Sequence, residues 1–194
     1  MNGTVIRLLT PRHGDARGWF SETWSERRFR AAGVECRFVQ DNQSRSEAAG
    51  VVRGLHFQHP PFAQAKLVRC LRGAILDVVV DIRAGSPTFG RGLGVELSEA
   101  NGEQLFIPAG FAHGFATLTP GAEVAYKVSA PYSPEHEGGL AWDDPALDVK
   151  WPIARDAAAL SARDQVWPRL DALDTPFTGD APMRLAVVNL GDIA

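Results

Sequence analysis

The sequence predicts a mainly β protein, an antiparallel sandwich or small barrel with a few short helices, mostly near the C-terminus. Short segments rich in β-branched and aromatic residues recur along the chain, which is typical of sheets. The chain also contains 19 glycines and 13 prolines, which mark frequent turns. Because 194 residues suffice for one buried core, we expect residues 1–194 to form a single domain.

Composition excludes several classes of function. The net charge of −3 gives no basic surface for nucleic acid, and no apolar run approaches the roughly 20 residues of a membrane span. The N-terminus lacks the apolar core of a signal peptide. Cys36 and Cys70 have neither zinc-site spacing nor a secretory context, so we expect reduced thiols, no metal, and a cytoplasmic protein.

The first elements are a strand over residues 4–9 and a short helix over 25–33. Ser25 is a suitable N-cap for this helix, and Gly33 would end it. Residues 36–46 predict a strand that runs into a polar loop. Each assignment follows from local residue preference alone.

Polar residues gather at two places in this N-terminal part. Arg17 and Glu22 lie in a turn-rich segment, which is either a solvated loop or part of a site. Gln40, Asp41 and Asn42 follow the apolar part of the predicted strand. They would either hydrogen-bond a polyhydroxylated or heterocyclic ligand or form a turn.

The most informative stretch is residues 50–70, where two β-rich runs predict a hairpin. The first run carries Arg53 and His56, and the second begins with Lys66. A base beside two cations suits proton abstraction next to a carbonyl. Strict alternation places Arg53 and His56 on opposite faces, unless a bulge at Gly54 brings them together. The alternative is a hairpin with one buried histidine and two surface cations.

Strands follow over residues 73–83, 93–98, 105–107, 111–118 and 123–128. In the first of them, Asp77 and Asp81 share a face that alternation predicts to be exposed, either solvated or paired with arginine. His113 has glycines close by on either side, which allow close approach of the backbone. It is either a core hydrogen-bonding group or a ligand-binding one. Tyr126 is either core or a candidate acid, since a phenol has a reference pKa of about 10.

The C-terminal third is less readable. Residues 129–152 predict a long loop rich in proline and glycine. Residues 153–167 predict a loop and a short helix, in which Ser161 and Asp164 resemble a capping box. Residues 183–190 predict a strand whose role is open.

A set of motifs along the chain is similar to a known family. In order, the motifs are DARGWFSE (15–22), FVQDNQSRS (38–46), GVVRGLHFQ (50–58), AKLVRC (65–70), DVVVDIR (77–83), SPTFG (86–90), IPAGFAHGF (107–115), YKV (126–128), PYSPEHEGG (131–139), WDDP (142–145) and LSARD (160–164). Together they resemble the dTDP-4-dehydrorhamnose 3,5-epimerase family. The resemblance implies a cupin-type jelly roll with a core over about residues 5–165, and a C-terminal helical segment and tail over about 153–194.

The family converts dTDP-4-keto-6-deoxy-D-glucose to dTDP-4-keto-L-rhamnose without metal or cofactor, because the substrate ketone acidifies the protons at C3 and C5. By this resemblance His56 is the general base and Asp164 its orienting partner. Tyr126 is the acid that returns a proton to the opposite face, as inversion of a carbon requires. Lys66 would stabilise the enolate oxygen, with His113 close by.

The resemblance also implies binding residues and an assembly. Contacts to the nucleotide, diphosphate or sugar fall on Arg17, Phe20, Glu22, Gln40, Asn42, Arg53, Lys66, His113, Glu137 and Arg163. Tyr132 would stack near thymine. Arg163 stands where members often have lysine and keeps the charge. The family is a homodimer that exchanges N-terminal strands, so some of these residues would serve the neighbouring subunit.

Three alternatives stay open. A related enzyme that epimerises only C3 or only C5 would carry nearly the same motifs. A metal-dependent cupin oxygenase or isomerase would use His56, His59 and His113 as ligands, although the usual HxH pair is absent. A non-catalytic module that binds nucleotide sugars would not require the acid–base residues.

Overall fold

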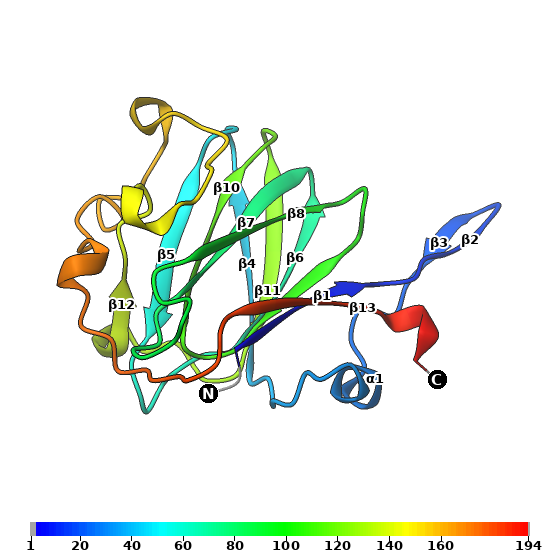
Figure 1. Ribbon diagram of the computed structural model, residues 1–194. Helices are drawn as coiled ribbons and strands as arrows, with labels where there is room; N and C mark the ends of the chain where they lie inside the picture. Colours follow the sequence, from blue (N-terminus) through cyan, green and yellow to red (C-terminus); the bar gives the residue numbers. More distant parts are fainter. Residues whose placement is uncertain (1–2, 194) are drawn as a thin grey trace.

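Two β-sheets, antiparallel except for one edge pair, face each other in the computed structural model, which describes residues 3–193 (Figure 1). One sheet has the order β13 (Arg184–Asn189), β1 (Thr4–Leu9), β9 (Gln104–Ile107), β6 (Lys66–Arg72), β11 (Ala122–Val128) and β4 (Gln40–Ser46). The other has the order β12 (Glu137–Gly139), β5 (Val52–Gln58), β10 (Phe111–Thr117), β7 (Ala74–Asp81) and β8 (Gly92–Ser98). The sheets do not close into a barrel, so the predicted sandwich is confirmed.

A small hairpin and a few short helices complete the described chain. The hairpin consists of β2 (His13–Asp15) and β3 (Gly18–Phe20) and extends away from the sandwich (Figure 1). The helices are α1 (Glu26–Ala31) and the 3₁₀ turns η1 (Pro134–His136), η2 (Pro145–Leu147), η3 (Arg155–Ala157), η4 (Leu170–Ala172) and η5 (Leu190–Asp192). Within residues 3–193, no helix is long and apolar enough to cross a membrane.

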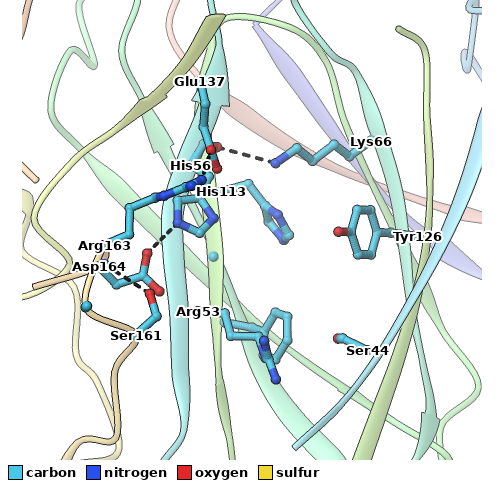
Figure 2. A pocket seen from close by; sticks show the side chains of 13 residues that line it. Ser44, Arg53, His56, Lys66, His113, Tyr126, Glu137, Ser161, Arg163 and Asp164 are labelled. Carbon is cyan, nitrogen blue, oxygen red and sulfur yellow. Dashed lines mark hydrogen bonds and ion pairs between the residues drawn. The ribbon is translucent and has the colours of Figure 1, made fainter. Parts of the chain in front are cut away.

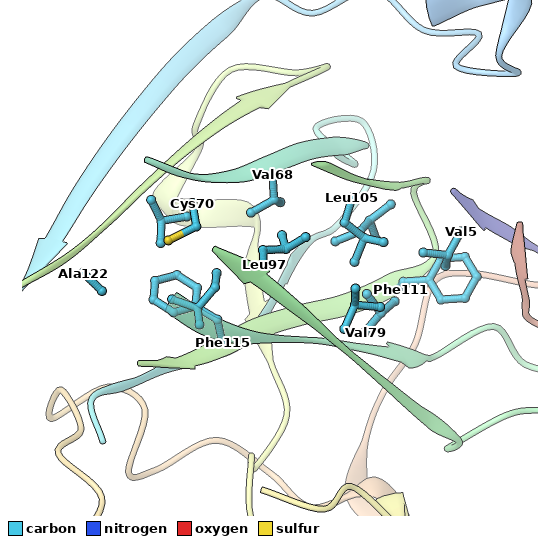
Figure 3. Packing of buried hydrophobic residues seen from close by; sticks show 13 residues of the cluster. Val5, Val68, Cys70, Val79, Leu97, Leu105, Phe111, Phe115 and Ala122 are labelled. Carbon is cyan, nitrogen blue, oxygen red and sulfur yellow. The ribbon is translucent and has the colours of Figure 1, made fainter. Parts of the chain in front are cut away.

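The main hydrophobic core lies between the two sheets (Figure 3). Val68 and Leu105 reach it from the six-stranded sheet, and Val79, Leu97 and Phe115 reach it from the other. Each of these side chains is almost fully buried. Burial of an aliphatic or aromatic side chain contributes about 1.5–3 kcal/mol, so this layer holds the sheets together.

Both outer faces are also partly covered. Segments after β12 cover the five-stranded sheet, with Leu140, Trp142 and Phe177 buried against it. On the other sheet, Phe29 of the predicted helix packs with Leu8 of β1 in a third cluster. The five-stranded sheet therefore has apolar side chains on both faces.

Two predictions about the first half of the chain are wrong. β5 and β6 do not pair as a hairpin but belong to opposite sheets, because the segment between them crosses the sandwich. The polar residues after position 39 form strand β4 rather than a loop or turn. This strand is at a sheet edge, where alternate side chains face solvent and a partly open interior, so polar residues suit both faces.

The acids of β7 are buried rather than solvated. Asp77 and Asp81 are both fully buried, since the sheet is covered on both faces. Asp81 pairs with the equally buried Arg83 at 2.6 Å, as predicted for a nearby arginine. Asp77 instead lies 3.0 Å from His113 Nε2.

The C-terminal part differs from its prediction in one place. Residues 162–165 form turns rather than a helix, although the Asp164 amide donates to Ser161 Oγ at 3.2 Å as in a helix cap. Pro168 follows directly and cannot continue a helix. Further on, the predicted strand is confirmed as β13, which pairs in parallel with β1 at the sheet edge.

Candidate active site

A cavity of about 570 Å³ opens between the sheets (Figure 2). Its walls come from β4, β5, β6, β10, β11, β12 and the loop around residues 161–164. A neighbouring cavity of about 300 Å³ shares His56, Lys66, Tyr126 and Glu137 with it. The two cavities therefore adjoin at these four side chains, and both are lined by polar and titratable groups.

A bulge in β5 brings Arg53 and His56 to the same cavity. His113 faces His56 and Phe115 faces Arg53 in the register with β10, so two residues of β5 oppose one residue of β10. Gly54 lies in this bulge with a φ of 122°, a conformation that favours glycine. A Cβ at Gly54 would lie 2.6 Å from Gly114 Cα. The bulge expected at Gly54 is therefore confirmed.

His56 and Asp164 form a hydrogen-bonded pair. His56 Nε2 lies 2.5 Å from Asp164 Oδ1. Burial raises the pKa of Asp164, but hydrogen bonds from His56, Ser161 and Trp167 outweigh burial, and the pKa lies below its ordinary value. An ionised Asp164 holds the proton of a neutral His56 on Nε2, which leaves Nδ1 as the basic ring nitrogen.

Tyr126 lies across the cavity from the His56–Asp164 pair (Figure 2). It projects from β11 on the opposite sheet. Burial raises the pKa of its phenol above the ordinary value, and the Arg53 charge only partly opposes this shift. The phenol is therefore protonated at neutral pH and can donate a proton.

Lys66, at the start of β6, lines the same cavities as His56 and Tyr126. Its ammonium donates to the backbone oxygen of His56 at 3.4 Å. Desolvation lowers the pKa of Lys66 to about 8, while the charges of Asp77 and Glu137 oppose the shift. At pH 7 this ammonium is still mostly charged and can stabilise a negative oxygen.

His113 adds a second imidazole to the cavity wall. Desolvation lowers the pKa of its ring below the ordinary value, although the Asp77 carboxylate favours the charged form. The hydrogen bond to Asp77 fixes the proton of neutral His113 on Nε2. His113 is thus held in one orientation by a group buried in β7.

A polar network lines the smaller cavity. Tyr132 donates its hydroxyl to Glu137 at 2.9 Å, and Arg163 pairs with the same carboxylate. Gln40 donates to Asn42 at 2.8 Å and accepts from the Tyr132 amide at 3.1 Å. These predicted binding residues therefore lie together next to the acid–base groups.

Three predicted site residues do not join the cavity of their own chain. Arg17 and Phe20 belong to the β2–β3 hairpin or its turn, and Glu22 follows it. The Arg17 side chain is 90% exposed and pairs with Asp15 in the same hairpin. Phe20 is 70% exposed, and Glu22 pairs with Arg28. None of the three lines either cavity described above.

The side chains do not support a metal triad. His59 packs against Phe57 outside the larger cavity, while His56 and His113 each bond a different aspartate. In the part of the chain from residue 3 to residue 193, no group of three or more His, Cys, Asp or Glu side chains could hold a metal ion. The cavity instead suits acid–base chemistry on a bound organic molecule.

Sequence reasoning missed several residues of this site. Ser44 and Phe115 line the cavity, Asp77 holds His113, and Trp167 contacts Asp164. The charge of Asp77 on an otherwise apolar strand was a usable signal. Trp167 gave none, since a tryptophan is usually a core residue.

The comparisons with known proteins identify the family. The family model described as dTDP-4-dehydrorhamnose 3,5-epimerase matches residues 3–172. The chain belongs to this epimerase family. One relative, the dTDP-4-dehydrorhamnose 3,5-epimerase of Sinorhizobium fredii, is 53% identical over 89% of this chain and 88% of its own. As an isomerase of this family, the chain is an enzyme that acts on nucleotide sugars.

Solved structures agree with the family assignment. The epimerase from Legionella pneumophila, in complex with dTDP-4-keto-L-rhamnose, has a TM-score of 0.81 and 45% identity, covering 86% of this chain and 87% of that one. A 3′-monoepimerase from Streptomyces bikiniensis, in complex with dTDP-quinovose, has a TM-score of 0.79 and 36% identity, covering 86% and 84%. The cupin-type fold expected from the motifs is confirmed.

Proposed function

We propose that this epimerase converts dTDP-4-keto-6-deoxy-D-glucose to dTDP-4-keto-L-rhamnose with His56 as base and Tyr126 as acid. The observation that supports the proposal most directly is that these two side chains face one cavity from opposite sheets. Inversion of a carbon needs removal of a proton from one face and delivery to the other. The identity to the Sinorhizobium fredii enzyme supports the choice of substrate.

Each inversion is a balanced pair of proton transfers. His56 Nδ1 takes the proton from C3 or C5, and the electron pair of the broken C–H bond moves to the C4 oxygen as an enolate. Lys66 and the neighbouring cavity groups stabilise this oxygen; one such donor typically contributes about 3–4 kcal/mol. Tyr126 then protonates the carbon from the opposite face. The substrate ketone supplies the activation, so this mechanism requires no cofactor.

The proposal is tested by incubating the protein with dTDP-4-keto-6-deoxyglucose in D2O. Mass spectrometry and proton NMR should find solvent deuterium at both C3 and C5 of the product. Deuterium at one carbon would instead identify a single-position epimerase, the alternative supported by the likeness to the 3′-monoepimerase. Binding without deuterium uptake would leave a non-catalytic module, which the assembled acid–base set disfavours.

The rate should depend on the charge of Lys66. Since desolvation lowers the pKa of Lys66 to about 8, raising the pH through about 8 removes the proton that stabilises the enolate. We therefore expect kcat to fall above this pH in a pH–rate profile. Lys66→Arg keeps its charge and should move this basic limb to higher pH. An unmoved limb in an active Lys66→Arg enzyme would show that another group controls it.

We further infer a homodimer in which the β2–β3 hairpin of one subunit completes the cavity of the other. Trp19 and Phe20 on this hairpin are 59% and 70% exposed, which is unusual for large apolar side chains. The hairpin also carries Arg17, a suitable diphosphate ligand that lines neither of the two cavities described above. The cytoplasmic location expected from the sequence stays a prediction.

A mixing experiment tests this exchange. Arg17→Ala and His56→Ala variants should each be nearly inactive, but their co-expression should restore activity. A mixed dimer has one site with both native residues, so random pairing should restore about a quarter of the wild-type activity. Co-expression of His56→Ala with Tyr126→Phe is the control, because both residues line one cavity of the same chain. Failure to restore activity in verified mixed dimers would place Arg17 and His56 in the same site.

A further inference from the structure

Trp167 contacts the proposed base and its partner without lining either cavity. Its indole Nε1 donates to Asp164 Oδ1 at 3.3 Å, and the same oxygen bonds His56 Nε2 at 2.5 Å. Its ring also lies edge-to-face against the His56 ring, with centroids 6.1 Å apart. Because Trp167 lines neither cavity, a bound substrate there would not touch it.

The indole of Trp167 packs against the edge strand β12. Gly139 of β12 pairs directly with His56 of β5. The indole lies over Gly139 so closely that a Cβ there would overlap the ring. Gly139 does not have a positive φ, so its backbone conformation is open to other residues. The need for glycine at this position therefore comes from the tryptophan ring.

The backbone fixes the same arrangement. The amide of Ala141, two residues beyond Gly139, donates to the Pro168 oxygen at 2.8 Å, which ties the chain next to Trp167 to the end of β12. The Asp164 amide is held by Ser161 Oγ. The carboxylate of Asp164 is thus positioned from two sides, by its own turn and by the indole.

We propose that Trp167 is a positioning residue that holds the Asp164 carboxylate against His56, and that Gly139 provides the space for it. This inference deepens the proposed function and rests on it only for the role of His56 as base. The indole N–H shares Oδ1 with His56, so it moderates how strongly the carboxylate binds the imidazolium. The ring also contacts the imidazole edge-to-face, which limits the orientations open to the His56 ring.

The first test is a double-mutant cycle with Gly139→Ala and Trp167→Ala. Each single variant should lower kcat by up to about 100-fold with little change in KM, because misplacement of a catalytic group by about 1 Å can have this effect. In the Trp167→Ala background, Gly139→Ala should have almost no further effect, since the clash is gone. Equal effects of Gly139→Ala in both backgrounds would overturn the proposal.

The second test uses Trp167→Phe, which keeps an aromatic ring and removes the N–H. Loss of this donor leaves Asp164 free to bind the imidazolium more strongly, so His56 should lose its proton at higher pH. The acid limb of kcat/KM should move to higher pH accordingly. The other charged or titratable groups lining the cavity are unchanged in this variant: Arg53, Lys66, His113, Tyr126, Glu137 and Arg163.

A measurement without substrate separates this inference from the proposed function. The imidazole of His56 can be titrated by NMR in the free enzyme with ¹⁵N-labelled histidine, using His56→Asn to assign the signal. An upward shift in Trp167→Phe supports the positioning role even if the dTDP sugar is not turned over. An unshifted or downward-shifted titration in a folded variant would overturn it.

Discussion

His56→Ala should abolish measurable epimerisation. General-base catalysis contributes about 10²–10⁴-fold. Among the described cavity groups, His113 is held by Asp77, Glu137 pairs with Arg163, and Lys66 is mostly protonated at pH 7, so none is a ready substitute for His56. The expected result is a loss of deuterium exchange at both C3 and C5 of dTDP-4-keto-6-deoxyglucose in D2O. Proton NMR of the recovered sugar measures both positions in one experiment.

Matched variants separate the base from its support. Asp164→Asn should retain a smaller part of the activity, because the base remains but loses the carboxylate that fixes its tautomer and stabilises its charged form. His59→Ala is the control, since this histidine packs against Phe57 and does not line the larger cavity. Near wild-type turnover by a folded His56→Ala enzyme would show that the assignment of the base is wrong.

The local part of this site was predictable because it depends on neighbouring residues. Gly54 between Arg53 and His56 indicated a bulge, since glycine weakens regular pairing and adopts a positive φ. Because of this bulge, the cation Arg53 and the base His56 line the same cavity. Most strands were likewise found from short apolar patterns.

The parts that were not predictable depend on residues far apart in the chain. The residue patterns of β5 and β6 do not indicate that the two strands belong to opposite sheets. The short connection between them favoured a hairpin instead. The pairing of β13 with β1 joins the two ends of the chain, and pattern gives no partner for an edge strand. Burial of Asp77 depends on a covering segment after β12, so alternation wrongly indicated an exposed face.

Dependence on distant residues also explains why some binding residues could be identified from motifs while their position in space could not be predicted. Motifs implied roles for Arg17, Phe20 and Glu22, and the fold sets them on or beside a projecting hairpin. The proposed assembly with a second copy would bring them to a cavity. A site divided between two chains cannot be completed from one chain, which is why the mixing experiment is informative.

Tyr126→Phe should separate the two halves of the reaction. The variant keeps His56, Asp164 and Lys66, so it can still remove a proton and form the enolate. It lacks the phenol that lies on the opposite side of the cavity, so proton return to the opposite face should fail. We therefore expect a large loss of inverted product, while the substrate itself still takes up deuterium as His56 returns solvent-derived deuterons to the original face.

The design of this measurement distinguishes the acid from a wall residue. Proton NMR in D2O should show exchange at C3 or C5 with retained configuration in Tyr126→Phe, whereas His56→Ala should show neither exchange nor inversion. Tyr132→Phe is the matched control, because its hydroxyl bonds Glu137 in the neighbouring cavity and should affect binding more than proton transfer. Equal loss of exchange and inversion in Tyr126→Phe would mean that the phenol also helps to form the enolate. Since burial raises the pKa of Tyr126, its phenol stays protonated where Lys66 begins to lose charge, and only the lysine should set the basic limb.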